Sequence, residues 1–459
     1  MPTKDQAQSI FDRIRKFSTA GEIEILFSST NFSLTRFANN TIHQNVAELN
    51  ESASIRAAFD GKTARASTNR FDDESLKRAV QLAESMAKVQ HPNPDLLPMA
   101  SPNEFQPSQG PKRWYDKTAA ITPGDRAEAV GKIVSIAKKN GLTTAGIFSS
   151  TQSAETIVNS NGLTAHHEQT SAEVSITMLD KDSSGWQKAN SPDVGNVDYA
   201  RLAETAAQKA RESKNPKELP PGKYTVILEP AAVLDLVGFM FADFSGLGIL
   251  DQRSFLNNRI GTKLFGENIT IRDDVFHPLQ SGPAFDGEGV PRTRVTLVEN
   301  GTIGNLVYAR GTAKKMRGSE YAGKVGAIQV TGHGFPLPNE MGEAPMNIVF
   351  ETPGAEQTIA QMIAGTERGI LVTRLWYIRE VDPYEKILTG MTRDGTFLVE
   401  GGQIKYGIRN FRFNQSIIET LNSVEAMSKA ERSCGEESFD MVVPAMKIAQ
   451  FNFTETTKF

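Results

Sequence analysis

Histidine and cysteine, the side chains that most often hold zinc, are few and scattered in this sequence. Histidine occurs six times and cysteine once, at Cys434. The densest group is His166-His167-Glu168. On a strand, neighbouring residues point to opposite faces, so the two histidines would not share one metal there. We expect this group to lie in a solvated loop. The remaining histidines are His43, His91, His277 and His333.

The isolated candidates have plain structural interpretations. His277 precedes Pro278 and is expected in a loop. His333 lies in Thr331-Gly332-His333-Gly334; it could line a cleft, but we favour a surface loop. Cys434 alone would make a poor zinc site, because zinc is held by several N, S or O ligands. We expect a small thiol without a chemical role.

Asp286 and Glu288 flank Gly287 and form the clearest pair of carboxylates. On a strand, residues i and i+2 share a face, so the pair could act together as acid and base. The alternative is a tight turn, in which the carboxylates accept hydrogen bonds from backbone amides. We favour the turn.

The stretch Lys223–Leu250 contains the elements most suited to position a site. Tyr224–Leu228 predicts a strand, and Glu229–Phe241 predicts a helix. The apolar residues of that helix recur at i, i+3, i+4 and i+7, which places them on one face. They are Val233, Leu236, Val237 and Met240. The stretch has no histidine or cysteine, and its acidic residues are Glu229, Asp235 and Asp243.

Length and charge set the class of protein. A chain of 459 residues is long enough for two or three domains. Its 50 basic and 54 acidic residues give a net charge of -4, which argues against sequence-independent binding of nucleic acid. One cysteine fits a reducing cytoplasm, and we expect no membrane span or signal peptide. The most apolar window, Ala231–Leu250, contains two aspartates and predicts a buried helix and loop.

The first half of the chain repeats itself. A helix over Asp5–Phe17, strands, and a helix over Asp73–Lys88 are followed by a helix over Pro123–Lys139, strands, and a helix over Asp198–Ser213. Phe27–Thr30 (FSST) recurs as Phe148–Thr151, an offset of 121 residues. Three further identities keep this offset: Asn40 and Asn161, Ser54 and Ser175, Ile55 and Ile176. The first unit's strands are predicted over Glu22–Ser29, Leu34–Phe37 and Ala47–Ala58.

Composition suggests where these units end. Residues 91–114 hold six of the 22 prolines, at positions 92, 94, 98, 102, 107 and 111, which excludes a helix or a central strand. We predict an N-terminal α+β domain over 1–90, a proline-rich linker or surface arm over 91–118, a middle α+β domain over 119–221 and a C-terminal domain over 222–459. The fold class is α+β: duplicated N-terminal α+β units, then a large antiparallel β-rich domain.

The C-terminal region is predicted to be rich in strands. Turns at Glu299–Gly301, Arg393–Gly395 and Gly401-Gly402 indicate hairpins. Helices are predicted over Gln357–Ile363 and Ser416–Lys429. The predicted strands are Thr293–Glu299, Ala327–Val330, Met346–Phe350, Leu371–Tyr377, Thr396–Glu400 and Lys405–Arg412.

Several motifs together resemble one family, in an order that covers nearly the whole chain. Arg36–Asn40 with His43-Gln44, then Ala66–Asn69, resembles the first domain of the TldD/PmbA family, once called modulator of DNA gyrase. The sequences that resemble its C-terminal domain are Phe285–Pro291 (FDGEGVP), Glu299–Gly301, Tyr308 with Thr312–Lys314, Gly369–Thr373 and Cys434-Gly435.

The resemblance implies a zinc peptidase site that this chain has lost. Active family members resemble zinc peptidases with an HExxxH motif and a C-terminal cysteine ligand. Aligned on Gly238, the two histidines and the glutamate correspond to Leu234, Phe239 and Asp235, and Cys434 matches the cysteine. Leu and Phe offer no lone pair to zinc. A spacing of i, i+5 spans about 140° of an ideal helix, so metal binding would need a local widening that nothing here requires.

The resemblance therefore implies a subunit of TldE/PmbA type, without catalytic residues, metal ligands or cofactor of its own. Its partner would be a TldD-like subunit carrying HExxxH, or a second copy in a homodimer, and its ligand an unfolded or modified peptide. It would shape and roof the peptide channel. Two alternatives stay open: an autonomous hydrolase with a rewired metal site that joins Asp235, Cys434 and a displaced histidine, or a peptide-binding scaffold without a protease partner.

Overall fold

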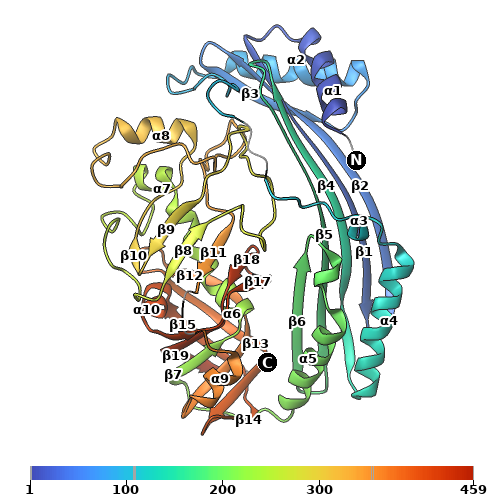
Figure 1. The fold of residues 1–459 in the computed structure, drawn as a ribbon, viewed down its shortest axis with the longest axis vertical. Helices are drawn as coiled ribbons and strands as arrows, with labels where there is room; N and C mark the ends of the chain where they lie inside the picture. The colour runs from blue at the N-terminus through green and yellow to red at the C-terminus, as the bar shows by residue number, and fades with distance from the viewer. Residues whose placement is uncertain (1–2, 107–109, 353, 355, 458–459) are drawn as a thin grey trace.

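The N-terminal half builds one six-stranded antiparallel sheet in the order β3-β2-β1-β4-β5-β6. The structure, a computed structural model, describes residues 3–106, 110–352, 354 and 356–457. Long strands run along one side of the molecule, with α1 and α2 at one end of the sheet and α4 and α5 at the other (Figure 1). The strands are β1 Glu22–Ala38, β2 Thr41–Phe59, β3 Lys62–Thr68, β4 Thr143–Asn159, β5 Thr164–Leu179 and β6 Ser184–Ser191.

The repeat at 121 residues is present in the structure. β1 begins at Glu22 and β4 at Thr143, and both strands have 17 residues. Each unit is a helix, three antiparallel strands and a helix, and the two units join through the β1–β4 pairing. The predicted element order is therefore confirmed. The helices are α1 Lys4–Phe17, α2 Asp73–Val89, α4 Pro123–Lys139, α5 Tyr199–Glu212 and a 3₁₀ turn, η1, Val194–Asn196.

One strand was wrongly divided by the sequence prediction. Glu22–Ser29 and Leu34–Phe37 belong to the single strand β1, which is paired along its length with β2 and β4. Hydrogen bonds on both edges hold the polar residues between the two predicted pieces in the sheet.

The proline-rich arm forms hydrogen bonds with the C-terminal half of the chain. Apart from the short helix α3 (Asp116–Ala119), its described residues form no helix. Arg113 donates hydrogen bonds to the carbonyl oxygens of Val275, His277 and Pro278. Arg310 of the C-terminal half donates to the carbonyl oxygen of Pro98 at 2.7 Å. The arm therefore packs on the C-terminal region. Pro107 lies outside the described residues.

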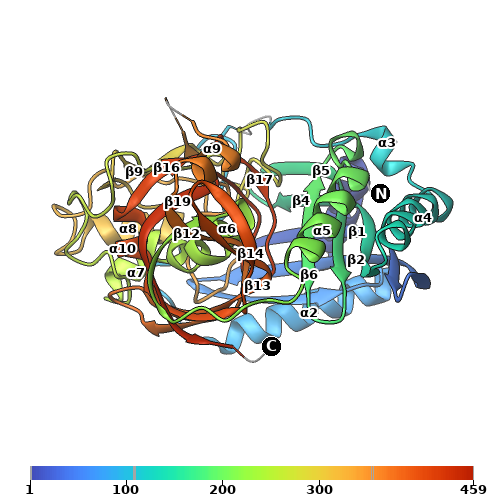
Figure 2. The same ribbon diagram turned by 90° about the horizontal axis from the view of Figure 1, so that it is seen from below.

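The C-terminal half is strand-rich, as predicted. One sheet has the order β10-β9-β8-β11-β18-β17; the other has β12-β7-β19-β15-β13-β14, and β12 also pairs with β13, which closes a barrel (Figure 2). Pairing is mainly antiparallel, but β7–β12 and β11–β18 are parallel. The strands are β7 Gly222–Leu228, β8 Thr270–Asp273, β9 Val295–Glu299, β10 Thr302–Ile303, β11 Ile348–Glu351, β12 Arg368–Asp382, β13 Ile387–Glu400, β14 Gln403–Gly407, β15 Phe411–Ser416, β16 Val424–Met427, β17 Glu431–Ser433, β18 Met441–Val443 and β19 Met446–Thr456.

Four predictions in this half were wrong in detail. Ala327–Val330 is not a strand, since Gly326 and Gly332 have positive φ and turn the chain there. Lys405–Arg412 is divided between β14 and β15, and Ser416–Lys429 is helical only over α10 (Ile417–Asn422), before β16. Arg393–Gly395 is an irregularity within β13, not a hairpin.

The main hydrophobic core lies between the two C-terminal sheets and includes helix α6 (Pro230–Val237). The remaining helices are α7 Gly246–Leu250, α8 Arg310–Arg317, α9 Ile359–Ala364 and the 3₁₀ segment η2 Gly238–Phe244. None of the helices in the described ranges is long and apolar enough to cross a membrane.

Candidate functional site

Helix α6 carries the positions that the sequence resemblance aligned with a metal-binding motif. It begins at Pro230, whose missing N–H is not needed at the start of a helix. It ends at Val237, and the chain continues as η2 from Gly238. The α-helix predicted over Glu229–Phe241 is therefore wrong beyond Val237. A 3₁₀ turn winds more tightly than an α-helix, which is opposite to the widening that i, i+5 ligands would need.

The three motif positions differ in their surroundings. Leu234 and Asp235 are both 0% exposed. Phe239 is only partly buried and lines a cavity of about 790 Å³ together with Asp243 and Lys386. Leucine and phenylalanine at these positions predict a space filled by packing, without an open pocket. The cavity at Phe239 contradicts this prediction. Leu234 alone fills space as predicted.

The loop after Cys434 packs directly on the helix. Oδ1 of Asp235 accepts hydrogen bonds from the backbone amides of Glu436 at 3.1 Å and Glu437 at 3.0 Å. A Cβ atom on Gly435 would lie 2.1 Å from that oxygen and 2.6 Å from Leu234. Helix and loop are thus joined by a carboxylate, and the space between them is closed.

Asp235 is electrostatically unusual. Its Oδ2 is buried and has no hydrogen-bond partner among the described residues. Burial raises the pKa of Asp235 to about 7, although the two amides and the charge of Arg374 favour the ionised form. The neutral acid is thus easily populated near pH 7.

The residues present do not fit a zinc ion. Leu234 and Phe239 have no donor atoms, and burial raises the pKa of the Cys434 thiol, which disfavours the thiolate that binds metal. Within the described ranges, no three His, Cys, Asp or Glu side chains lie close enough together to hold a metal. We derive no catalytic step through zinc in this chain; absence of bound zinc stays a prediction.

The histidine pair does not lie in a solvated loop, as the sequence had suggested, but on strand β5. Both histidines are partly buried. His166 Nδ1 lies 2.8 Å from Thr156 Oγ1, and His167 Nε2 lies 3.4 Å from Gln169 Oε1. A long continuous pairing of β4 with β5 explains the difference, because it keeps these polar residues in the sheet. His43 and His91 are exposed, and His277 is in a loop.

His333 is the largest error of the sequence prediction. It is 1% exposed, not a surface residue, and its Nε2 lies 3.0 Å from Oδ1 of Asp273. Burial alone would raise the pKa of Asp273, but attraction to His333 lowers it. Asp273 Oδ2 accepts from the amides of Met346 and Asn347, so this pair joins three segments. Glycines on both sides of His333 gave no sign of such a core position.

The Asp286–Glu288 segment is a turn, as predicted. Asp286 Oδ1 accepts from the amides of Glu288 and Val290, and its Oδ2 accepts from Gly334. Glu288 contacts Arg310 Nη1 at 3.4 Å. Burial raises the pKa of both carboxyl groups. Their hydrogen bonds are those of a folded turn and leave no free carboxylate pair for acid–base chemistry.

A buried ion pair between Arg374 and Asp394, near α6, was missed by the sequence analysis. Asp394 Oδ2 accepts from Nε and Nη2 of Arg374 at 2.8 and 2.5 Å, and Ser184 Oγ donates to Asp394 Oδ1. The guanidinium of Arg374 lies 4.8 Å from the ring centroid of Trp186 and 5.1 Å from that of Trp376. The only signal was Asp394-Gly395, whose positive φ values belong to a strand irregularity.

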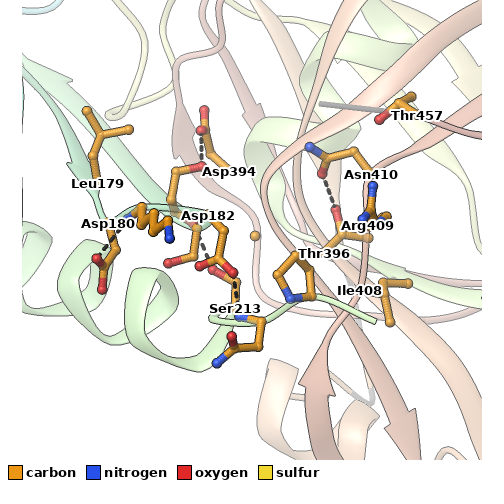
Figure 3. A pocket seen from close by; sticks show the side chains of 16 residues that line it. Leu179, Asp180, Asp182, Ser213, Asp394, Thr396, Ile408, Arg409, Asn410 and Thr457 are labelled. Atoms are coloured by element: carbon orange, nitrogen blue, oxygen red, sulfur yellow. Dashed lines mark hydrogen bonds between the residues drawn. The ribbon is translucent and has the colours of Figure 1, made fainter. Parts of the chain in front are cut away.

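This ion pair lies beside a cavity of about 670 Å³ between the β5–β6 turn and β13 (Figure 3). Asp180 and Asp182 line one side, and Thr396 and Asn410 line the other. Thr396 Oγ1 donates to Asn410 Oδ1 at 3.0 Å. Many of these groups bond to one another, which indicates a structural junction between the two halves.

A second cleft, of about 560 Å³, lies between β6 and β17. Trp186 and Arg201 line it from the N-terminal half, and Pro230 of α6 and Arg432 line it from the C-terminal half. Ser433, the residue before Cys434, also contributes. The cleft therefore adjoins the closed helix–loop contact and mixes apolar and charged groups.

A solved structure resembles the chain over nearly all of its length, and two relatives match it in sequence over shorter stretches. A crystal structure of TldE from Thermococcus kodakarensis has a TM-score of 0.84 and 22% identity, covering 98% of this chain and 100% of that one. A Methanothermobacter thermautotrophicus protein described as a metalloprotease is 22% identical over 67% of each chain. An uncharacterized Methanocaldococcus jannaschii protein is 26% identical over 55% of this chain; the match spans 59% of that relative's length.

Family models match three successive regions. Residues 23–87 match PmbA/TldA metallopeptidase domain 1, and residues 116–214 match the central domain. Residues 221–455 match the PmbA/TldA metallopeptidase C-terminal domain. This last match alone covers more than half of the 459 residues. The chain therefore belongs to the PmbA/TldD metallopeptidase family.

Proposed function

We propose that this chain is the non-catalytic subunit of a cytoplasmic peptide-processing complex, and that a TldD-like partner with an HExxxH motif supplies the zinc. The observation that carries the proposal is the contact of Asp235 with the Cys434 loop. Gly435 occupies the space beside Asp235 Oδ1, and Leu234 closes the other side. In this arrangement the family's helix and cysteine loop are held by hydrogen bonds instead of a metal.

The cleft between β6 and β17 supports a role in shaping a peptide channel. It adjoins α6 and the Cys434 loop, and its charged and apolar lining suits an unfolded or modified peptide. A hydrolase with a rewired metal site is less well supported. It would need Asp235, Cys434 and a histidine to converge, whereas His166, His167 and His333 contact other partners.

The test is reconstitution with the HExxxH-bearing paralogue from the same genome. We expect the chain alone to show no peptidase activity and the two chains together to elute as one complex with activity. A peptidase activity of the chain alone that a chelator removes would contradict the proposal. Failure of the two chains to associate would also contradict it, and would favour a homodimer or a peptide-binding scaffold.

A further inference from the structure

The outer edge of β2 is long and has no backbone partner. Over Ala53–Phe59 this edge pairs with β3, but over Thr41–Ser52 β2 pairs with β1 alone. The backbone of Thr41–Ser52 forms no other hydrogen bond with the segments that the structure describes. In Figure 1, β2 lies at the side of the sheet farther from the C-terminal half. A row of unpaired N–H and C=O groups is a template on which another strand can pair.

The side chains of this edge are exposed on both faces of the sheet. Successive residues of a strand point to opposite faces, yet the four residues from Ala47 to Asn50 are all exposed. Among them, Leu49 is 62% exposed. The sequence Thr41–Ser52 also contains no lysine, arginine or proline, the residues that commonly keep an exposed edge from pairing.

The two end strands of the sheet differ from β2 in this respect. β3 carries Lys62 and Arg65. At β6, Asn190 accepts a hydrogen bond from Arg432 of β17, and Lys188 donates to the carbonyl oxygen of Gly435. Basic residues therefore protect β3, and side chains of the C-terminal half occupy part of the β6 edge. The edge of β2 has neither form of protection.

The shape of the edge selects its occupant. From Ala53 onward β3 occupies the edge, and at the other end β2 begins after the turn at Asn39-Asn40. An antiparallel strand that fills the edge must therefore end before it meets β3. A second copy of β2 meets this condition when the two strands are centred on Val46, because its own turn then lies opposite Ser52.

We propose that the β2 edges of two copies of this chain pair antiparallel about a two-fold axis at Val46, which joins the two sheets into one. Val46 then lies opposite its own copy, and β-branched pairs stabilise a sheet. Gln44 lies opposite Glu48 of the second copy, so its amide group donates to a carboxylate twice in the dimer. No two like charges lie opposite each other in this register. The irregular step in the β1–β2 pairing, at Arg36-Phe37, lies outside these central pairs.

Cysteine cross-linking of the purified chain tests this register. The natural Cys434 is buried and should stay unreacted. In Val46→Cys the two new cysteines lie directly opposite each other, with Cα atoms about 4.5–5.5 Å apart, a distance that a disulfide bond spans. Mild oxidation should therefore give a covalent dimer. The control is Asn50→Cys, also on β2, whose two copies would be about 27 Å apart and should not cross-link.

Charge changes at Gln44 test its pairing with Glu48. Both residues are exposed, so the variants should fold normally. In sedimentation equilibrium over a range of chain concentrations, Gln44→Glu should weaken dimerisation several-fold and Gln44→Lys should strengthen it, because each pair occurs twice in the dimer. Gln81→Glu makes the same charge change at an exposed position of α2 and should have no effect.

A monomer at every concentration would overturn the proposal. A dimer that gives no Val46→Cys cross-link, or that responds to neither change at Gln44, would also overturn it, since its interface would then lie elsewhere. The chain is tested without a zinc-bearing subunit. These results are therefore independent of the proposed function, which is tested by adding that subunit.

Discussion

Gly435 lies so close to Asp235 that a Cβ atom would be 2.1 Å from the carboxylate oxygen Oδ1. This contact allows the backbone after Cys434 to reach the carboxylate, which accepts two amide hydrogen bonds. A hydrogen-bonded carboxylate thus joins the two segments.

Gly435→Ala should destabilise the fold. The new methyl group meets Asp235 and Leu234, both fully buried, so one of them must shift. Overpacking of this kind costs about 1–3 kcal/mol. Thermal and denaturant unfolding would measure the loss. The matched control is Gly131→Ala in α4, where nothing lies within 4 Å and alanine should be neutral or stabilising. Equal stability of both variants would show that the contact is looser than described.

Asp235→Asn should change how stability depends on pH. The folded-state pKa of Asp235 is about 7, above its usual 3.8, so the folded state binds a proton more tightly than the unfolded chain. Its contribution to stability is therefore lost as pH rises from about 4 to about 7. Asparagine carries no such charge and can still accept at Oδ1. We expect the variant to gain stability relative to wild type over this window, by up to about 4 kcal/mol.

Denaturant titrations of both proteins at several pH values measure this difference. Other carboxyl groups with raised pKa, such as Asp286, are present in both proteins and cancel. A constant difference between pH 4 and pH 8 would mean that Asp235 is ionised and well solvated, contrary to its described burial.

The duplicated half was predictable because its signals are local. A shared offset and the alternation of helices with strands both lie in the sequence, and β1 and β4 begin exactly that offset apart. What the sequence could not give was the joining of β1 to β4 in one sheet. That pairing is non-local. His166 and His167 were misplaced for another reason: the long continuous pairing of β4 with β5 keeps these polar residues in a strand instead of a loop.

The site was partly predictable. The absence of histidine from the two motif positions could be read from Leu234 and Phe239, but the change to a 3₁₀ segment at Gly238 could not. A Cβ at Gly238 would lie 1.8 Å from Ser438 Oγ. The need for glycine here therefore comes from close packing against a loop 200 residues away in the sequence. The pairings of His333 and Arg374 were also missed. Asp273, the partner of His333, is distant in the sequence, and Asp394, the partner of Arg374, lies in a segment that was predicted as a hairpin turn.

Asp394→Asn should destabilise the junction between the two halves. Arg374 and Asp394 are 7% and 5% exposed at their side chains, so the variant leaves a buried guanidinium without its charge partner. Breaking a buried pair costs about 3–5 kcal/mol. Chemical denaturation would measure it. The control is Glu74→Gln, whose ion pair with Arg78 is exposed and should cost less than about 1 kcal/mol. If both changes have the same small effect, the Arg374 pair is not structural.

The purified chain should contain no stoichiometric zinc. Elemental analysis after purification without chelator measures the metal directly. About one tightly held zinc per chain would contradict the prediction, and Cys434→Ser would then show whether the cysteine takes part.

The triple variant Leu234→His, Asp235→Glu and Phe239→His should not restore a zinc site. The longer glutamate at position 235 would collide with Gly435 and with the side chain at position 234, because this space is already filled. The two new histidines would lie on opposite sides of the α6–η2 boundary, where the chain tightens instead of widening. We therefore expect lower thermal stability and no bound zinc. Phe239→His alone is the control, since Phe239 lines a cavity and can be replaced with less strain. Tight zinc binding by the triple variant, with peptide cleavage, would show that the helix and the Cys434 loop can reopen into the geometry of an active relative.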